Sequence, residues 1–185
     1  FCKRADGPYM KGKVWPGECN FPDYTNPAVR EWWAGLFKEL ISEVGVKGVW
    51  NDMNEPAVME VPNKTFPMDV RHDYDGNPCS HRKAHNIYGT QMARATYHGV
   101  KRFAYPKRPF VITRSAYSGA QRYSSSWTGD NVATWEHLWI ANIQVQRMSI
   151  SGMGFTGSDI GGFAEQPSGE LYARWIQLGV FHPFC

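Results

Sequence analysis

Four charged residues each follow a short apolar segment of the sequence, and two of them could act as a catalytic carboxyl pair. The four are Asp52, Arg114, Asp130 and Asp159. A single aspartate in such a place is often only a turn or a helix cap, so the recurrence of the pattern carries the inference. Asp52 and Asp130 each have a tryptophan shortly before them, and their surroundings could push two carboxyl pKa values apart. Arg114 could keep a neighbouring carboxylate ionised.

Hydrolysis of a glycosidic bond is a reaction that such a pair suits. One carboxylate faces the positive charge that develops at the anomeric carbon, and the other carboxyl group protonates the leaving oxygen. The aromatic content of 15% fits a large core or a sugar site, since flat rings stack on sugars. Glu55 is an alternative acid, because an Asn-Glu-Pro run also occurs in β-glycosidases that use two glutamates. The later strand ends carry Asp130 and Asp159 and no second glutamate, which disfavours that alternative.

The segments that must position these residues read as alternating strands and helices. Strands are expected at 46–50, 109–113, 123–128 and 153–156. Asn26, Thr134 and Ser168 are expected to cap helices that run to about 45, 149 and 178, and a further helix is expected at 84–104. Residues 1–25 are expected to be loop, and 54–82 a long irregular insertion. This alternation predicts a parallel α/β fold, either a barrel or a doubly wound sheet, although 157–162 lacks the Gly-x-Gly-x-x-Gly spacing of the latter.

Composition excludes several other classes of protein. The net charge of +3 comes without a basic run, so no nucleic-acid partner is expected. No apolar stretch approaches the roughly 18 residues of a membrane span. The four cysteines form no Cys-x-x-Cys pair, which favours unpaired thiols over a zinc site. His72, Asp73 and Asp75 are interpreted as a solvated charged loop, and His81 with His85 as residues of a helix start, so no metal ligands are expected.

Several motifs stand in order along the chain. The run Gly48-Val49-Trp50-Asn51-Asp52-Met53-Asn54-Glu55-Pro56 contains the first aspartate, and related runs lie at 114–123, 127–131 and 157–163. Shorter runs lie at 15–17, 21–23, 85–89 and 175–184. Together they resemble the motifs of glycoside hydrolase family 31, the α-glucosidases and their relatives, over nearly the whole chain. One departure is Ser158, where the family more often has alanine.

The resemblance implies a (β/α)8 TIM barrel in which the nucleophile follows the fourth strand and the acid/base residue follows the sixth. It makes Asp52 the nucleophile of a retaining reaction and Asp130 the general acid, later the base. The residues that would line or support the sugar pocket are Trp50, Met53, Arg114, Trp127, Phe163 and, at its floor, Asp159. No metal and no organic cofactor is implied.

Residues 1–185 are expected to be a partial catalytic barrel that covers about the fourth to seventh strands. The family's upstream sugar-binding aspartate would precede Phe1 and its downstream histidine would follow Cys185, so the isolated chain is expected to be inactive and poorly stable. The expected partners are an α-linked glucoside or oligosaccharide, the rest of the barrel and flanking β-domains. The motif favours an exo-acting α-glucosidase over an α-xylosidase. An α-glucosyltransferase or lyase on the same scaffold and a non-catalytic carbohydrate-binding barrel are alternatives.

Overall fold

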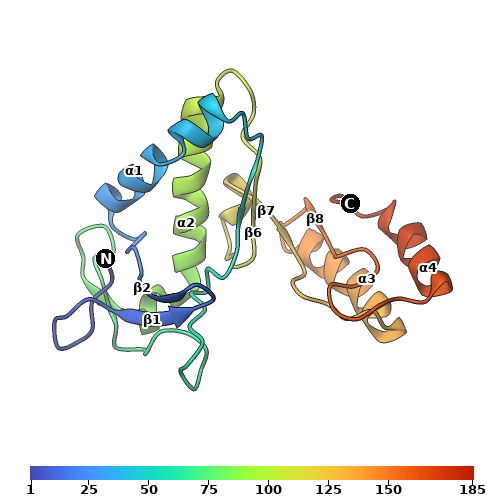
Figure 1. The fold of residues 1–185 in the computed structure, drawn as a ribbon, viewed down its shortest axis with the longest axis horizontal. Helices are drawn as coiled ribbons and strands as arrows, with labels where there is room; N and C mark the ends of the chain where they lie inside the picture. The colour runs from blue at the N-terminus through green and yellow to red at the C-terminus, as the bar shows by residue number, and fades with distance from the viewer. The chain divides into compact units, whose positions relative to one another are not determined.

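The computed structural model describes all 185 residues and divides into two compact units (Figure 1). Unit 1 comprises Phe1–Tyr117, and unit 2 comprises Ser118–Cys185. Each unit contains parallel strands combined with helices, so the α/β class expected from the sequence is confirmed. No helix of the structure combines the length and the apolar character that crossing a membrane would require.

Unit 1 opens with a β-hairpin where the sequence predicted loop. Strand β1 (Lys11–Val14) pairs antiparallel with β2 (Gly17–Asn20), with Val14 opposite Gly17 across a two-residue turn. The prediction of loop over 1–25 was therefore wrong. Strands of four residues are too short to show a clear alternation, and the glycines and prolines around them are typical of loops.

Two helices pack together in unit 1. Helix α1 (Pro27–Gly35) begins as predicted, because the side chain of Asn26 accepts hydrogen bonds from the first turn and proline occupies its start. It does not continue to residue 45, since a separate π-helical turn η1 (Glu39–Glu43) follows. Helix α2 (His81–Ala104) starts three residues before the predicted position. A Cβ atom at Gly99 of α2 would lie 2.6 Å from the carbonyl oxygen of Ala34, so glycine permits the close approach of α1.

The segment between these helices carries the first strand of the parallel pair. Strand β3 (Val49–Asn51) is shorter than the predicted strand at 46–50 and ends one residue later. It pairs in parallel with β6 (Val111–Thr113). Residues 54–70 contain no helix or strand. Strands β4 (Arg71–His72) and β5 (Cys79–Ser80) then form a short antiparallel pair before α2.

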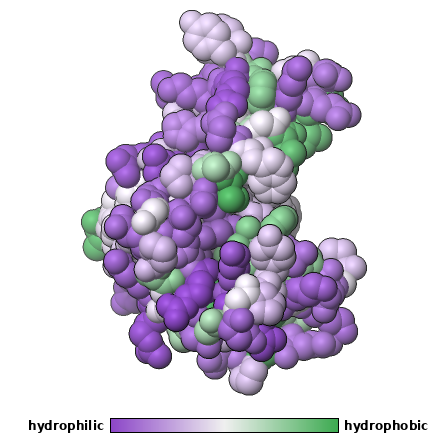
Figure 2. Space-filling view, turned by 90° about the vertical axis from the view of Figure 1, so that its left-hand side faces the viewer, coloured by the Kyte–Doolittle hydropathy of each residue, from purple (hydrophilic) through white to green (hydrophobic).

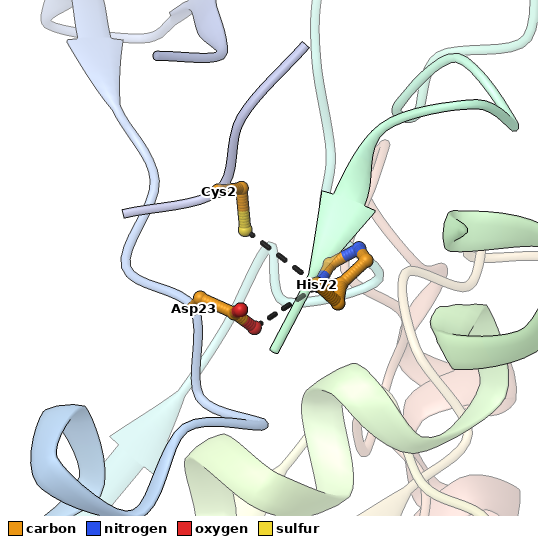
Figure 3. A group of neighbouring side chains, drawn as sticks. All are labelled: Cys2, Asp23 and His72. Atoms are coloured by element: carbon orange, nitrogen blue, oxygen red, sulfur yellow. Dashed lines mark hydrogen bonds and ion pairs between the residues drawn. The ribbon is translucent and has the colours of Figure 1, made fainter. Parts of the chain in front are cut away.

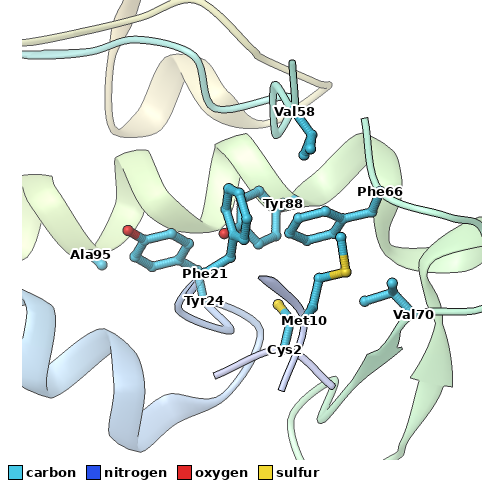
Figure 4. Packing of buried hydrophobic residues seen from close by; sticks show 9 residues of the cluster. All are labelled: Cys2, Met10, Phe21, Tyr24, Val58, Phe66, Val70, Tyr88 and Ala95. Carbon is cyan, nitrogen blue, oxygen red and sulfur yellow. The ribbon is translucent and has the colours of Figure 1, made fainter. Parts of the chain in front are cut away.

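The core of unit 1 consists of two apolar clusters. The larger cluster is built around the rings of Phe21, Tyr24, Phe66 and Tyr88, which meet mainly edge to face (Figure 4). The smaller one lies between η1, α2 and β6, and its buried residues are Phe37, Ile41, Val100 and Val111. The face of the molecule in Figure 2 is mainly hydrophilic, with hydrophobic residues in small separate groups. Several large apolar side chains of unit 1 are nevertheless exposed, among them Trp15 and Tyr105.

Unit 2 repeats the order of strand and helix. It contains the 3-10 turn η2 (Ala120–Arg122), β7 (Ser125–Trp127), α3 (Trp135–Ile150), β8 (Thr156–Gly157) and α4 (Gly169–Gly179). Strands β7 and β8 pair in parallel, with Trp127 opposite Gly157. The predicted caps Thr134 and Ser168 are confirmed, since their hydroxyls accept hydrogen bonds from His137 N and Leu171 N. Buried Trp175 of α4 packs with Ala141 and Leu171 at the centre of the unit.

Candidate active site

Asp52 and Arg114 meet at the carboxyl end of the parallel pair in unit 1. Asn51 of β3 lies opposite Thr113 of β6, so the residue after each strand emerges at the same edge. Arg114 Nη1 lies 3.2 Å from Oδ1 of Asp52. The Arg114 side chain is only 21% exposed, against 38% for Asp52, so its charge is less screened than that of a surface cation. The ion pair therefore fixes the position of the Asp52 carboxylate relative to the guanidinium.

The same guanidinium is held from its other side by Glu55. Arg114 Nε donates to Oε1 of Glu55 at 2.8 Å, and Nη2 donates to Oε2 at 2.9 Å. Such a bidentate pair fixes both the position and the plane of a guanidinium. Arg114 Nη2 also contacts Sδ of Met53. Glu55, which the sequence analysis set aside as an acid, is therefore a residue that orients the partner of Asp52.

Asn54 fixes the loop after β3 from behind. Its buried side chain donates to Oγ1 of Thr113 at 2.8 Å and accepts from the backbone N–H of Ser115 at 3.0 Å. A Cβ atom on Gly89 of α2 would lie 2.7–2.8 Å from Ser115 and from the carbonyl oxygen of Asn54. Helix α2 therefore presses directly on this loop. No role of Asn54 was predicted from the sequence, because nothing but its place in the run from Gly48 to Pro56 distinguishes it.

The side chains around Asp52 alternate between exposed and buried. Trp50 is 58% exposed and Asn51 is 3% exposed, as expected for neighbouring residues of a strand. Met53 has a φ of +56°, in the left-handed region that side chains other than glycine seldom occupy. Strain of this kind persists where the surrounding contacts enforce it, and it is common at functional sites.

Asp130 and Asp159 form the corresponding acidic group in unit 2. Both follow parallel strands, β7 and β8. The pKa of the Asp159 carboxyl is raised, chiefly by burial and further by the negative charge of Asp130. The Asp159 carboxyl therefore keeps its proton to higher pH than an isolated aspartate in water.

Asn131 organises the backbone around this acidic pair. Its Nδ2 donates to the carbonyl oxygen of Asp159 at 3.0 Å, and its Oδ1 accepts from the N–H of Phe163 at 2.9 Å. A Cβ atom on Gly162, whose φ is +95°, would lie 2.6 Å from Ala133 N. The loop that carries Asp159 thus packs closely on the loop that carries Asp130. Asn131 was a further residue to which the sequence analysis gave no role.

The two aromatic residues of unit 2 that were expected in the pocket differ in exposure. Phe163 is 62% exposed, whereas Trp127 is 6% exposed. An exposed ring can stack on a sugar with its face, while a nearly buried one can offer only an edge. The departure at Ser158 also has a visible contact, because its Oγ lies 3.4 Å from Nε1 of buried Trp175, which can donate to it.

Comparisons with known proteins identify the family. The family model described as the glycosyl hydrolases family 31 TIM-barrel domain matches residues 1–185. The chain belongs to glycoside hydrolase family 31, and its residues are those of the family's TIM-barrel domain. This confirms the family resemblance read from the motifs.

Individual members of the family are similar to the chain over its whole length. The chain is 48% identical to alpha-glucosidase 2 of Bacillus thermoamyloliquefaciens over 100% of this chain and 23% of the relative. It is 42% identical to neutral alpha-glucosidase AB of Homo sapiens, over 100% of this chain and 20% of the relative. The catalytic subunit in a crystal structure of an ER glucosidase II heterodimeric complex superposes with a TM-score of 0.92 at 42% identity, covering 99% of this chain and 20% of that chain. The chain therefore spans about a fifth of the length of the relatives it matches.

Proposed function

We propose that the natural protein is a retaining α-glycoside hydrolase, an exo-acting α-glucosidase that releases glucose from α-glucosides. The observation that carries the proposal is the position of Arg114 against Asp52, with Glu55 orienting it. A carboxylate held in place by an oriented guanidinium can serve as the nucleophile that attacks an anomeric carbon. Family membership and the α-glucosidase names of the relatives support the choice of substrate.

In the proposed reaction, Asp52 attacks the anomeric carbon while Asp130 gives its proton to the leaving oxygen. The bond from carbon to the leaving oxygen breaks as the aspartyl ester forms, and the leaving group departs as an alcohol. Asp130 then takes a proton from a water molecule, whose oxygen attacks the anomeric carbon. The bond from that carbon to the Asp52 oxygen breaks, which releases the sugar and the Asp52 carboxylate. Asp159 lies close enough to Asp130 for the charge of Asp130 to raise the Asp159 pKa, so the two carboxyl groups belong to one acidic group at this strand edge. The carboxyl groups of Asp52 and Asp130 should lie about 5–5.5 Å apart with a sugar bound.

The remaining residues have proposed roles at the pocket. Trp50 and Phe163 offer exposed rings to the sugar, Met53 lies beside Arg114, and Trp127 contributes an edge. Asp159 is proposed to support the pocket floor. Strands β3, β6, β7 and β8 are proposed to correspond to the fourth to seventh strands of the family barrel, so a complete pocket needs further strands and residues 1–185 alone should be inactive.

The assignment of the two carboxyl groups can be tested in the natural full-length protein. Asp52→Asn should lower kcat/KM for an aryl α-glucoside by roughly 10⁴-fold or more, because no nucleophile remains. Asp130→Ala should slow substrates that need a proton on the leaving oxygen far more than activated aryl glucosides, which do not. The matched control is Asp69→Asn, an exposed aspartate of the same unit, which should keep normal rates. Near-normal turnover by Asp52→Asn would rule the proposal out.

A further inference from the structure

Three side chains with ligand atoms meet in the interior of unit 1, and none of them belongs to the candidate active site. Sγ of Cys2 lies 3.8 Å from Nδ1 of His72, and the same nitrogen lies 3.0 Å from Oδ1 of Asp23. All three ligand atoms lie within 4.8 Å of one another, and all three residues are buried. Figure 3 shows the three side chains converging from separate segments of the chain. Thiolate, imidazole and carboxylate are the ligand types that proteins use for zinc.

Two of the separations lie near those of a tetrahedral zinc site. With Zn–S near 2.3 Å and Zn–N and Zn–O near 2.1 Å, tetrahedral angles place sulfur about 3.6 Å from nitrogen and nitrogen about 3.4 Å from oxygen. The observed separations are 3.8 Å and 3.0 Å, so the imidazole and the carboxylate would move apart by a few tenths of an ångström on binding. The carbonyl oxygen of Pro22 lies 3.7 Å from Sγ of Cys2 and accepts from the hydroxyl of Tyr88, which leaves it one lone pair for a fourth ligand bond.

The carboxylate is held in place independently of any metal. Oδ1 of Asp23 accepts from the hydroxyl of Thr25 at 2.7 Å, and Oδ2 accepts from the backbone N–H of Asp73 at 2.7 Å. Outer contacts of this kind orient the ligands of metal sites and limit their movement. Oδ1 also accepts from the backbone N–H of Thr25 at 3.2 Å, so a metal bound here would replace the present contact between Oδ1 and Nδ1 of His72.

The imidazole has an outer shell made of two further histidines. Nε2 of His72 lies 2.9 Å from Nδ1 of His81, and Nε2 of His81 lies 2.9 Å from Nδ1 of His85. When His72 donates its Nδ1–H to Asp23, each ring carries its proton on Nδ1. When Nδ1 of His72 binds a metal, each ring carries its proton on Nε2 and donates outward. Both arrangements place one proton between each pair of rings, so the chain accommodates coordination without an unsatisfied nitrogen.

We propose that Cys2, Asp23 and His72 form a structural zinc site that ties the N-terminal segment, the loop before α1 and strand β4 together. The charges balance, because one thiolate and one carboxylate neutralise a divalent cation. Binding releases the thiol proton; the imidazoles keep three protons in all, one leaving Nδ1 of His72 and one being taken up at Nε2 of His85. Burial raises the pKa of the Cys2 thiol, so the metal itself must drive its ionisation.

Cobalt(II) provides a direct test in the natural full-length protein. After chelation and removal of the chelator, one equivalent of Co²⁺ should give a thiolate-to-cobalt charge-transfer band in the near ultraviolet and the intense visible bands of tetrahedral cobalt. Zn²⁺ should displace the cobalt and abolish both, while Mg²⁺ should not, since it prefers oxygen ligands. Cys2→Ser should lose the charge-transfer band. Cys19→Ser is the matched control, because Cys19 is a second free thiol that packs against the same apolar cluster, and it should keep the band.

A second measurement covers the case in which the serine variant folds poorly. Cys2→Val keeps an apolar side chain of similar size in the cluster, and its melting temperature should not respond to Zn²⁺, whereas that of the unmodified protein should rise. Absence of the band in the unmodified protein, or a band or zinc-dependent melting shift that persists without Cys2, would overturn the proposal. None of these readouts depends on glycosidase activity, so they are independent of the function proposed above.

Discussion

The carboxylate in unit 1 and the carboxyl pair in unit 2 lie in opposite electrostatic surroundings. Asp52 faces the guanidinium of Arg114, which Glu55 holds by two hydrogen bonds. Asp159 instead faces the negative charge of Asp130, and together with burial this raises its pKa. Asp52 is thus held in an ion pair, whereas Asp159 keeps its proton to higher pH than an isolated aspartate. The two regions give their carboxyl groups different partners, and a glycoside hydrolase needs carboxyl groups with two different roles.

Removal of the charge of Glu55 should have the largest effect among the following variants, because it alters the surroundings of Asp52. In the natural full-length protein, Glu55→Gln should lower kcat by about 100-fold, comparable to the loss of one oriented charge-stabilising group, because Arg114 is no longer held against Asp52. Melting temperature and KM should change much less than kcat. Glu60→Gln, an exposed glutamate five residues later, is the control and should leave kcat unchanged. Equal losses in both variants would show that Glu55 does not act through Arg114.

Two glycine substitutions test the close packing of the loop after β3 in unit 1 and of the loop after β7 in unit 2. Gly89→Ala should destabilise the protein by about 1–3 kcal/mol, because its Cβ would meet Ser115 and the backbone of Asn54. Gly162→Ala should cost at least as much, since its left-handed φ adds strain to a clash with Ala133. The control is Gly35→Ala at the end of α1, where no atom lies within 4 Å of the added Cβ. Denaturant unfolding measures all three, and a cost at Gly35 equal to that at Gly89 would contradict the packing argument.

Ser158→Ala tests a contact found only in unit 2. The substitution removes the oxygen 3.4 Å from Nε1 of Trp175, a long hydrogen bond, so it should cost no more than about 1 kcal/mol. Ser118→Ala, at an exposed serine, should have no measurable effect. If Ser158→Ala is neutral in denaturant unfolding, the indole N–H finds another acceptor.

The smallest expected effect is a gain in stability, whereas the preceding variants lose stability or activity. A carboxyl group whose folded-state pKa is raised adds stability at low pH that is lost as pH rises through the folded pKa. Asp159→Asn should therefore stabilise the protein slightly at pH 7, where ionised Asp159 faces Asp130, and the gain should disappear near pH 3. Melting temperatures at the two pH values provide the measurement. A loss of stability at pH 7 would indicate that the Asp159 carboxylate makes a favourable contact.

Local features of the fold were predictable from the sequence. The caps Asn26, Thr134 and Ser168 are correct, because a side chain that accepts from the next turn is a short-range signal. Strand limits were less accurate. Strand β6 begins at Val111 although apolar residues and a proline precede it, since a strand exists only where a partner lies alongside and proline cannot donate to it.

Contacts between distant residues were predicted only in part. The sequence indicated that Arg114 could serve a carboxylate, but it could not show that Glu55 would take two of its donors. His72 was interpreted as part of a solvated loop, and this was wrong, because the ring is 2% exposed and contacts Asp23. The two residues are 49 positions apart, and no local pattern reports such a meeting.

The left-handed backbone conformation of Met53 restricts how the segment from Asp52 to Glu55 can change in evolution. In a regular strand Asp52, Met53 and Glu55 would point alternately to two sides, yet all three contact the one guanidinium of Arg114. The turn of the chain at Met53 is what brings them together. A single inserted or deleted codon between Asp52 and Glu55 would separate the attacking group from its cation, so drift here should proceed by replacement and not by change of length.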